Sequence, residues 1–403
     1  MPKIVFIGGL WNKSKEEYII NNSIGNIQNA ANVFQWNMIS GLDAFSTGGV
    51  DILSSFFIGS FPFRFKKFFI SSEQFNHLEN ESHKDFYVGF LNLPIIKHFS
   101  RAKRIIRQFK KSKYQCDKPI YVIGYSMTLS TVLSLKNIKK NFPFSKTCLV
   151  VPDLPEYMNT GKRQMMTSII KKFYTKKLYQ DIKSIDSFVV LTEPIYQALG
   201  VSNKRHCVIE GVCSDNYKLP KEKFYTIRTI FYSGGLCEKY GINDLVDAFF
   251  KIADKNVRLV LCGDGDSVKY IKLAMEKDSR IVYLGLISND RVLELQRQAF
   301  LLINPRKPDE DFTKYSFPSK TIEYMISGRP VLMYKLDCIP NEYDDYLIYI
   351  ENGLSESINR VLMTDECKLD ELGEKARNFI LCNKNSIAQA KKILNMFELS
   401  VNE

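Results

Sequence analysis

Short apolar runs alternate with longer amphipathic stretches along the first half of the chain, and this pattern predicts strands that alternate with helices. The apolar runs predict strands at residues 3–7, 50–58, 68–70, 86–92, 120–123, 148–151, 187–191 and 205–210. Helical spacing predicts helices at residues 27–42, 94–112, 128–135, 162–185 and 193–199. Because strand–helix alternation is typical of parallel sheets covered on both faces, this half is expected to be a doubly wound domain.

The second half repeats the alternation without repeating the sequence. Strands are predicted at residues 229–233, 258–262, 281–284, 301–304, 331–332 and 346–350, and helices at 243–252, 291–299 and 388–398. The polar stretch 214–226, with Pro220 and several lysines, is typical of a linker. The pattern predicts an α/β protein of two Rossmann-like domains that face each other across a cleft.

The expected boundaries follow from the linker and from the last helix. The first domain spans residues 1–213 and the second spans residues 227–384. Residues 385–403 form a C-terminal helix that we expect to pack back on the first domain.

Residues 315–332, with the sequence YSFPSKTIEYMISGRPVL, combine several signals in a short span. Pro318 suits a first helical turn, Gly328 suits the end of that helix, and a buried strand follows. Free N–H groups at a helix start bind anions, and Lys320 adds a cation beside them. Glu323, about one turn further in, is suited to accept two hydrogen bonds from a sugar diol. An ordinary helix-to-strand junction is the alternative interpretation.

This pattern resembles the donor-site motif of GT-B glycosyltransferases, in particular family-four-like enzymes of capsule and exopolysaccharide synthesis. The resemblance is specific over residues 229–350 and implies that Glu323 holds the ribose of a nucleotide-sugar. Tyr315 stands where the usual motif has a second glutamate that touches the sugar. The family also usually has an arginine at the position of Gly235 and a lysine at that of Tyr240, and both bind phosphate.

The candidate donor residues follow predicted strand ends, where α/β sheets bind ligands. Glycine pairs there let backbone N–H groups approach a pyrophosphate, and plain turns are the alternative. Arg306 and Lys320 are the best substitutes for the missing cations and are predicted to stabilise the departing diphosphate. The predicted donor-binding residues are Gly234, Gly235, Lys239, Gly263, Gly285, Leu286, Tyr315, Ser316, Pro318, Ser319 and Glu323.

The first half is expected to bind the acceptor. Gly8 and Gly9 end its first strand, and Asn29 and Asn32 belong to an amide cluster that either binds sugar hydroxyls or is solvated helix surface. Asp153 follows a buried strand and resembles a position that many capsular transferases keep acidic. It is therefore predicted, with Arg306 and Lys320, to be catalytic.

Composition limits the partners. The 403 residues are 45% hydrophobic and 25% charged, and the net charge of +12 favours an anionic partner. Since no nucleic-acid-binding signature occurs, substrate phosphates and an anionic membrane surface are the expected partners. The basic helix at 162–183 either lies on such a membrane or is an ordinary domain helix. The sequence leaves open whether the protein forms a homo-oligomer.

Cysteine and histidine usage indicates the compartment and the metal content. The nine cysteines show no paired spacing, and the N-terminus is apolar over too short a run for a signal peptide. We therefore expect a cytoplasmic protein, peripheral at the inner face of the membrane. The four histidines do not form a metal pattern, although His77 and His83 are close in sequence, so neither a metal site nor a cofactor is predicted.

The function predicted from the sequence is a glycosyltransferase, a hexosyltransferase that moves a sugar from a nucleotide diphosphate sugar to a lipid-linked or surface glycan. The resemblance implies retention of configuration and a reaction without metal. The same fold also supports sugar-nucleotide epimerases, and the losses at Gly235, Tyr240 and Tyr315 are compatible with a non-catalytic partner subunit of another glycosyltransferase.

Overall fold

The computed structural model describes residues 2–25, 27–79, 83–114, 119–156, 165–213, 227–309 and 313–398, and it describes no side chains for residues 165–171. The chain divides into two compact units. Unit 1 comprises Met1–Val212 and Ser386–Glu403, and unit 2 comprises Cys213–Asn385. The predicted linker, residues 214–226, lies outside the described residues.

Unit 1 is built on one mainly parallel sheet with the strand order β10-β9-β8-β7-β1-β2-β5-β4, in which only β4 runs antiparallel among the described strands. A separate antiparallel pair joins β3 to β6. The strands are β1 (Lys3–Gly8), β2 (Asp51–Ser54), β3 (Phe69–Ile70), β4 (Glu73–Phe75), β5 (Asp85–Tyr87), β6 (Phe90–Leu91), β7 (Ile120–Tyr125), β8 (Ser145–Val151), β9 (Ser187–Val190) and β10 (Arg205–Val208).

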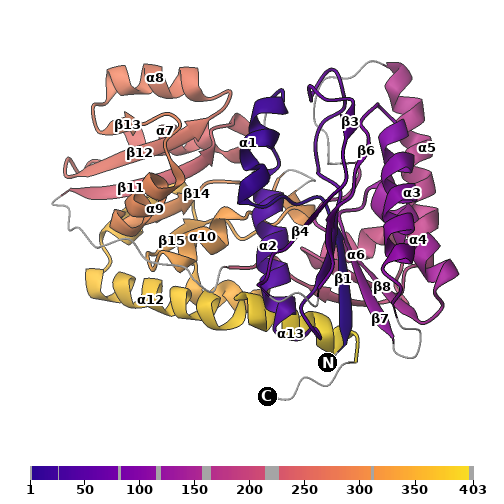
Figure 1. The fold of residues 1–403 in the computed structure, drawn as a ribbon. Coiled ribbons are helices and arrows are strands. Elements are labelled where there is room, and N and C mark those ends of the chain that lie inside the picture. The colour runs from indigo at the N-terminus through magenta and orange to yellow at the C-terminus, as the bar shows by residue number, and fades with distance from the viewer. Residues whose placement is uncertain are drawn as a thin grey trace. The chain divides into compact units, whose positions relative to one another are not determined.

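Helices cover both faces of this sheet (Figure 1). They are α1 (Lys13–Asn22), α2 (Asn29–Asp43), α3 (Ile96–Lys111), α4 (Leu129–Asn141), α5 (Met165–Asp181), α6 (Glu193–Leu199) and the C-terminal α13 (Ser386–Met396). Helix α13 packs beside α2, where a Cβ atom on Gly41 would lie 2.0 Å from the carbonyl oxygen of Ser386. Met38 and Ile39 of α2 share one apolar core with Ile393 and Leu394 of α13.

Unit 2 is built on a parallel sheet with the strand order β13-β12-β11-β14-β15-β16. Its strands are β11 (Arg228–Gly235), β12 (Val257–Asp264), β13 (Ile281–Tyr283), β14 (Leu301–Asn304), β15 (Val331–Met333) and β16 (Ile348–Tyr349). Its helices are α7 (Ile242–Phe250), α8 (Val268–Lys277), α9 (Asn289–Gln298), α10 (Lys320–Ile326), α11 (Leu354–Leu362) and α12 (Glu366–Asn383).

Side chains of the unit 2 strands alternate between two apolar cores, as the pleat of a strand requires. In β11, Ile230 and Tyr232 point into a core formed with α7, α8 and α11. Phe231, between them, points into a core formed with α9, α10 and α12. Both faces of the sheet are therefore covered, and loops at the carboxyl ends of the strands are left to carry the polar chemistry. These features confirm the predicted α/β class with two Rossmann-like halves.

The structure differs from the sequence prediction at several elements. The single strand predicted at 86–92 is two strands, β5 and β6, which belong to different sheets and are separated by Val88 and Gly89. No helix among the described residues has the length and apolarity needed to span a bilayer.

Candidate functional site

The carboxyl ends of β11 and β12 approach each other so closely that glycine is required there. Gly234 and Gly263 are paired in the parallel register, and a Cβ atom on Gly263 would lie 1.8 Å from the carbonyl oxygen of Gly234. Gly263 also has a φ of 137°, which other residues rarely adopt. The N–H of Gly263 donates to the carbonyl of Gly285 at 2.9 Å, and this hydrogen bond stabilises the turn.

Glu323 lies on α10, and protein groups hold its carboxylate in place. Lys320 Nζ donates to Glu323 Oε1 at 2.7 Å and to Oε2 at 2.8 Å. Gln296 Nε2 donates to Oε1 at 2.6 Å. The Glu323 side chain is 29% exposed, so a fixed carboxylate remains accessible from outside. Lys320, predicted to face phosphate, is paired with this carboxylate in the structure.

Two side chains tie α10 to the end of β11. Gln296 of α9 is fully buried and its amide also donates to Ser233 Oγ at 3.1 Å. Tyr324 is fully buried as well, and its hydroxyl accepts from the N–H of Ser233 at 2.9 Å and donates to its carbonyl at 3.2 Å. Ser233 directly precedes Gly234, so these bonds bring Glu323 to the glycine turn. The sequence prediction missed Gln296 as a site residue. The only indication in the sequence was that Gln296 lies in a helix predicted to cover the sheet.

Arg306 follows β14 and is buried beside the same turn. Its guanidinium carbon lies 6.0 Å from the centre of the Tyr240 ring. A Cβ atom on Gly235 would lie 3.2 Å from the edge of that ring. Burial lowers the pKa of Arg306 from its ordinary value, while the nearby thiol of Cys338 and the phenols of Tyr240 and Tyr232 act in the opposite direction. The structure thus gathers Gly235, Tyr240 and Arg306.

The other predicted donor residues lie around this turn and before α10. The ammonium group of Lys239 lies 5.1 Å from the centre of the Tyr240 ring, and Leu286 is 77% exposed. Gly285 has a φ of 69°, with open space where a side chain would be. Tyr315 ends a short 3-10 helix.

Backbone carbonyls of the segment before α10 accept hydrogen bonds that fix its position. The carbonyl of Ser316 accepts a hydrogen bond from the Cys338 thiol at 3.6 Å. Helix α10 starts two residues after Pro318, whose carbonyl accepts from the N–H of Thr321 at 2.8 Å. Ser319 is the N-cap residue, but its side chain makes no capping bond. Because α10 spans only 7 residues, the fixed carboxylate of Glu323 is stronger evidence for a ligand site than the N-terminus of the helix.

In unit 1 the predicted acceptor residues are largely used by the fold. The N–H of Gly9 donates to Gln35 Oε1 at 2.9 Å, and a Cβ atom on Gly9 would lie 2.1 Å from the Phe57 ring. A Cβ atom on Gly8 would lie 2.4 Å from Gln35 Oε1. The space beside Gly8 and Gly9 is therefore occupied by Gln35 and Phe57, which belong to unit 1 itself.

The amide and acidic candidates of unit 1 differ in exposure. Asn32 is buried, and its side-chain oxygen accepts from the N–H of Trp11 at 2.8 Å, whereas Asn29 is exposed at the start of α2. Asp153 is accessible after β8, but partial removal from water raises the pKa of its carboxyl. Burial, and then the charge of Asp153, raise the pKa of the neighbouring Tyr125 phenol. A raised carboxyl pKa suits a group that handles protons.

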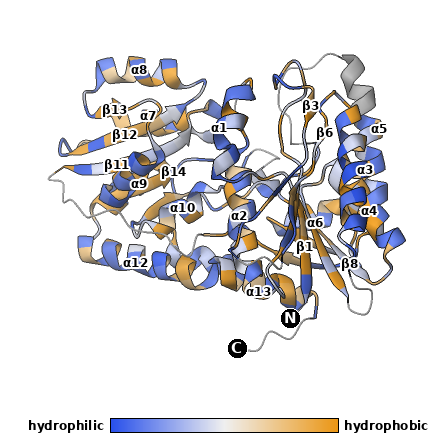
Figure 2. Ribbon diagram, in the orientation of Figure 1, coloured by the Kyte–Doolittle hydropathy of each residue, from blue (hydrophilic) through white to orange (hydrophobic). Residues whose placement is uncertain are grey.

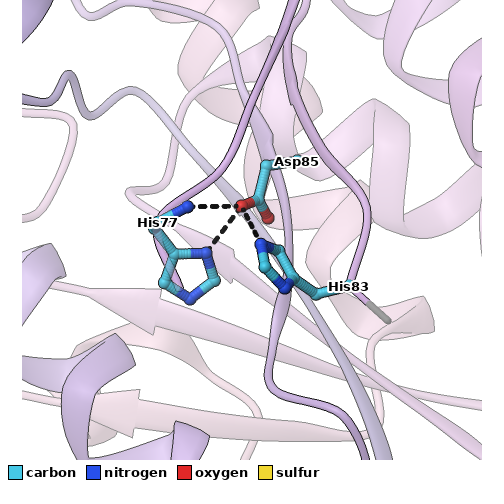
Figure 3. A group of neighbouring side chains, drawn as sticks. All are labelled: His77, His83 and Asp85. Atoms are coloured by element: carbon cyan, nitrogen blue, oxygen red, sulfur yellow. Dashed lines mark hydrogen bonds and ion pairs between the residues drawn. The ribbon is translucent and has the colours of Figure 1, made fainter. Parts of the chain in front are cut away.

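A second cluster of ionisable groups lies elsewhere in unit 1 (Figure 3). His77 Nδ1 lies 2.6 Å from Asp85 Oδ2, and His77 Nε2 lies 3.2 Å from Asp43 Oδ2. His83 Nε2 lies 3.1 Å from Asp85 Oδ2, and the side chains of His83 and Asp85 are fully buried. The sequence prediction paired the two histidines but missed the aspartates.

Histidine and aspartate are zinc ligands, and the ligand atoms of His77, His83 and Asp85 lie within 4.8 Å of one another. Both ring nitrogens of His77 nevertheless face carboxylate oxygens, so both carry protons and His77 has no lone pair for a metal. Burial would lower the pKa of His77, but hydrogen bonds to Asp43 and Asp85, and their charges, raise it to about 9. The cluster is therefore a buried ionic contact.

Comparisons with known proteins give the class. Residues 227–395 match the family described as glycosyl transferases, group 1. Sucrose-phosphate synthase from Thermosynechococcus elongatus is 15% identical, with 98% of each chain covered and a TM-score of 0.61. The lipopolysaccharide outer core galactosyltransferase WaaB is 13% identical, with 98% of this chain and 99% of that chain covered and a TM-score of 0.62.

The glycosyltransferase WaaG, which is involved in lipopolysaccharide biosynthesis, is 13% identical over 98% of this chain and 99% of that chain, with a TM-score of 0.56. No curated protein matches the sequence. The fold is thus GT-B, and the family match covers the part of the chain that carries Glu323 and Arg306. The chain therefore has the fold of GT-B glycosyltransferases and contains a group 1 glycosyl transferase domain at residues 227–395. This confirms the predicted class and enzyme type, and the capsular type stays a prediction.

Proposed function

We propose that this glycosyltransferase moves a hexosyl group from a nucleotide diphosphate sugar to a lipid-linked or surface glycan, with retention of configuration and without a metal or other cofactor. The observation that carries the proposal is the carboxylate of Glu323. It is fixed by Lys320 and Gln296 beside Ser233 and the glycine turn, and it remains partly exposed. A fixed acceptor of this kind suits the two hydroxyls of a ribose.

Charge on the departing diphosphate needs cations. The cations usual in the family are replaced by Gly235 and Tyr240, but Arg306 lies against the Tyr240 ring. We propose that the Arg306 guanidinium binds the diphosphate in their place, because a planar fork of donors matches phosphate oxygens. Preorganised charge of this kind stabilises a leaving group without reorganisation during the reaction.

Lys320 has a second part in this proposal. Without a donor, its ammonium group is bonded to both oxygens of Glu323. When ribose hydroxyls occupy those oxygens, Lys320 becomes available to the phosphates. Donor binding would thus exchange one partner of the lysine for another.

The acceptor is assigned to unit 1. Asp153, with its raised pKa and accessible carboxyl, is proposed to orient the acceptor hydroxyl. Asn29 is exposed and can contact sugar hydroxyls, whereas Asn32 supports the loop at Trp11.

The test is Glu323→Gln. The amide keeps the shape but removes the charge, and hydrogen bonds to charged groups contribute enough that donor affinity should fall about tenfold to a hundredfold. Calorimetry with nucleoside diphosphates and nucleotide-sugars measures this change. The matched control is Glu366→Gln, an exposed glutamate paired with Arg228 in the same unit. Equal donor affinity and turnover in wild type and Glu323→Gln would refute the assignment.

Activity separates the proposal from its alternatives. Release of nucleoside diphosphate should depend on a glycan acceptor and should persist with a chelator present. An epimerase would convert the nucleotide-sugar without any acceptor, and a non-catalytic subunit would bind or release no nucleoside diphosphate at all.

A further inference from the structure

Two segments of unit 1 are basic and lack acidic residues altogether. Residues 52–72 and 86–114 contain no aspartate or glutamate. Their basic residues are Arg64, Lys66, Lys67, Lys97, Arg101, Lys103, Arg104, Arg107, Lys110, Lys111 and Lys113. Together these two segments carry a net charge of +11, and the whole chain carries +12.

The fold joins the two segments into one surface. Strands β3 and β6 pair antiparallel, with Phe69 opposite Leu91. The N–H of Leu91 donates to Ser100 Oγ of α3 at 3.0 Å. The Arg104 guanidinium carbon lies 5.3 Å from the centre of the Phe69 ring. The β3–β6 pair and the beginning of α3 therefore lie side by side (Figure 1).

Large apolar side chains are exposed along this surface. Phe63 is 75% exposed and Ile95 is 60% exposed. We define the aromatic–basic surface as the exposed apolar residues Phe63, Phe68, Phe69, Leu91, Ile95, Ile96 and Phe99 together with the exposed basic residues Arg64, Lys66, Lys67, Lys103 and Arg107. In Figure 2, β3, β6 and α3 carry hydrophobic and hydrophilic colours side by side.

Beneath this surface the structure is well anchored. Arg101 of α3 is buried, with its guanidinium carbon 4.0 Å from the centre of the Phe90 ring and a hydrogen bond to the carbonyl of Phe56. A hollow of about 370 Å³ next to Phe99 is bounded by Lys103 and Ile106 of α3 and by Leu133 of α4. The exposed side chains thus project from a fixed base.

We propose that the aromatic–basic surface docks this enzyme on an anionic lipid bilayer. The phenylalanines and isoleucines would enter the boundary between headgroups and acyl chains, and the lysines and arginines would meet lipid phosphates. Soluble proteins rarely leave apolar side chains exposed in one continuous patch. Aromatic and aliphatic side chains bordered by lysine and arginine, on two segments whose sequences contain no acidic residue, match the interface of an anionic membrane in both polarity and charge.

The surface differs from the one that the sequence indicated. The sequence left two interpretations open for the basic helix at 162–183, membrane contact or an ordinary domain helix, and its described part is α5. In α5, Leu178 is buried in the core, and Lys177 Nζ pairs with Asp181 Oδ2 at 3.2 Å. Both contacts are typical of a helix that packs within a domain. Phe173 of this helix is 72% exposed. Lys162, Arg163, Met166, Ile170 and Lys171 have no described side chains.

The test is vesicle co-sedimentation of the full chain, which needs no turnover and is therefore independent of the donor-site experiment. Vesicles of phosphatidylcholine alone are compared with vesicles that also contain phosphatidylglycerol. One variant, Phe63→Ser with Phe68→Ser and Phe99→Ser, removes apolar insertion. Another, Lys66→Glu with Lys67→Glu, reverses charge. The controls are Leu273→Ser with Met363→Ser and Lys269→Glu with Lys272→Glu, all at exposed positions of unit 2.

Wild type should sediment with the anionic vesicles and much less with the neutral ones, and added salt should weaken the binding. Each surface variant should lose affinity by about tenfold or more while keeping the wild-type melting temperature and donor affinity. The unit 2 controls should bind like wild type. Failure of wild type to bind anionic vesicles, or equal binding by wild type and both surface variants, would overturn the proposal. Loss of self-association in the surface variants, without any vesicle binding by wild type, would assign the surface to a protein contact instead.

Discussion

At the scale of single residues, Gly263 combines an unusual backbone torsion with the closest backbone approach in the glycine turn. Gly263→Ala should destabilise the protein by about 3 kcal/mol, from strain at a φ that only glycine readily adopts plus forced displacement of β11. Denaturant unfolding measures the loss. Gly200 also has a positive φ, of 64°, but nothing lies within 4 Å of its Cβ position. Gly200→Ala should therefore cost only about 1 kcal/mol, and equal losses in the two variants would contradict the role of the close approach.

His77 makes stability depend on pH. Its pKa in the folded protein, about 9, lies above the ordinary value of 6.5. The stabilisation from its charged contacts is therefore complete below about pH 6.5 and is lost as the pH rises through 9. The free energy of unfolding, measured by urea titration between these pH values, should fall more steeply for wild type than for His77→Gln.

His77→Gln also measures how much the contact between His77 and Asp85 contributes to the free energy of unfolding. His77→Gln removes the charged imidazole beside the buried Asp85, which keeps His83 as a neighbour, and should destabilise the protein at neutral pH by about 3 kcal/mol. His206→Gln, at a half-exposed histidine beside Glu193, is the control and should change little. Parallel pH profiles for wild type and His77→Gln would show that His77 is not the titrating group.

The sequence predicts residues whose role is local and misses those whose role depends on distant partners. Glu323 stands out because its helix, proline and glycine lie within one short segment. Gln296 does not, because its partners Ser233 and Glu323 come from other elements. Asp85 escapes notice for the same reason, since the cluster it forms with His77 also includes Asp43, which comes from the end of α2.

At the scale of elements, α10 and β11 are joined through one buried hydroxyl. Tyr324→Phe removes both of its bonds and leaves the N–H of Ser233 buried without that acceptor. Stability should fall by about 1–3 kcal/mol, and donor affinity should fall with it because Glu323 is no longer held against the glycine turn. Thermal unfolding and calorimetry measure the two effects. Tyr270→Phe, at an exposed tyrosine bonded to Asp247, is the control. Lost stability with unchanged donor affinity would show that the helix needs no such tether.

Elements with a strong period are predictable, and short ones are not. The basic helix predicted at 94–112 is α3, because its apolar positions recur at helical spacing over four turns. The segment predicted as one strand at 86–92 has no polar side chain before Asn92 except the phenol of Tyr87, so no alternation reveals the break between β5 and β6. Prediction also omitted α1 and α8, where charged residues obscure the apolar face.

At the scale of the whole molecule, unit 1 is discontinuous in sequence. A chain that ends at Asn385 lacks α13, and with it Ile393 and Leu394 from the core beside α2. Unit 1 should lose about 3–6 kcal/mol from these two side chains alone, whereas unit 2 keeps all its residues. Calorimetry should resolve a lower transition for unit 1 and an unchanged one for unit 2. A single unchanged transition would show that α13 contributes no stability.

The discontinuity of unit 1 also has a consequence during synthesis. A ribosome adds roughly 5–20 residues per second, so on the order of ten seconds or more separates the emergence of Val212 from that of Ser386. Throughout that interval the nascent first half exposes the apolar groove that α13 will fill. The intervening half can finish folding while it is still tethered, although it is made later. We expect nascent chains to recruit chaperones at this groove until α13 emerges.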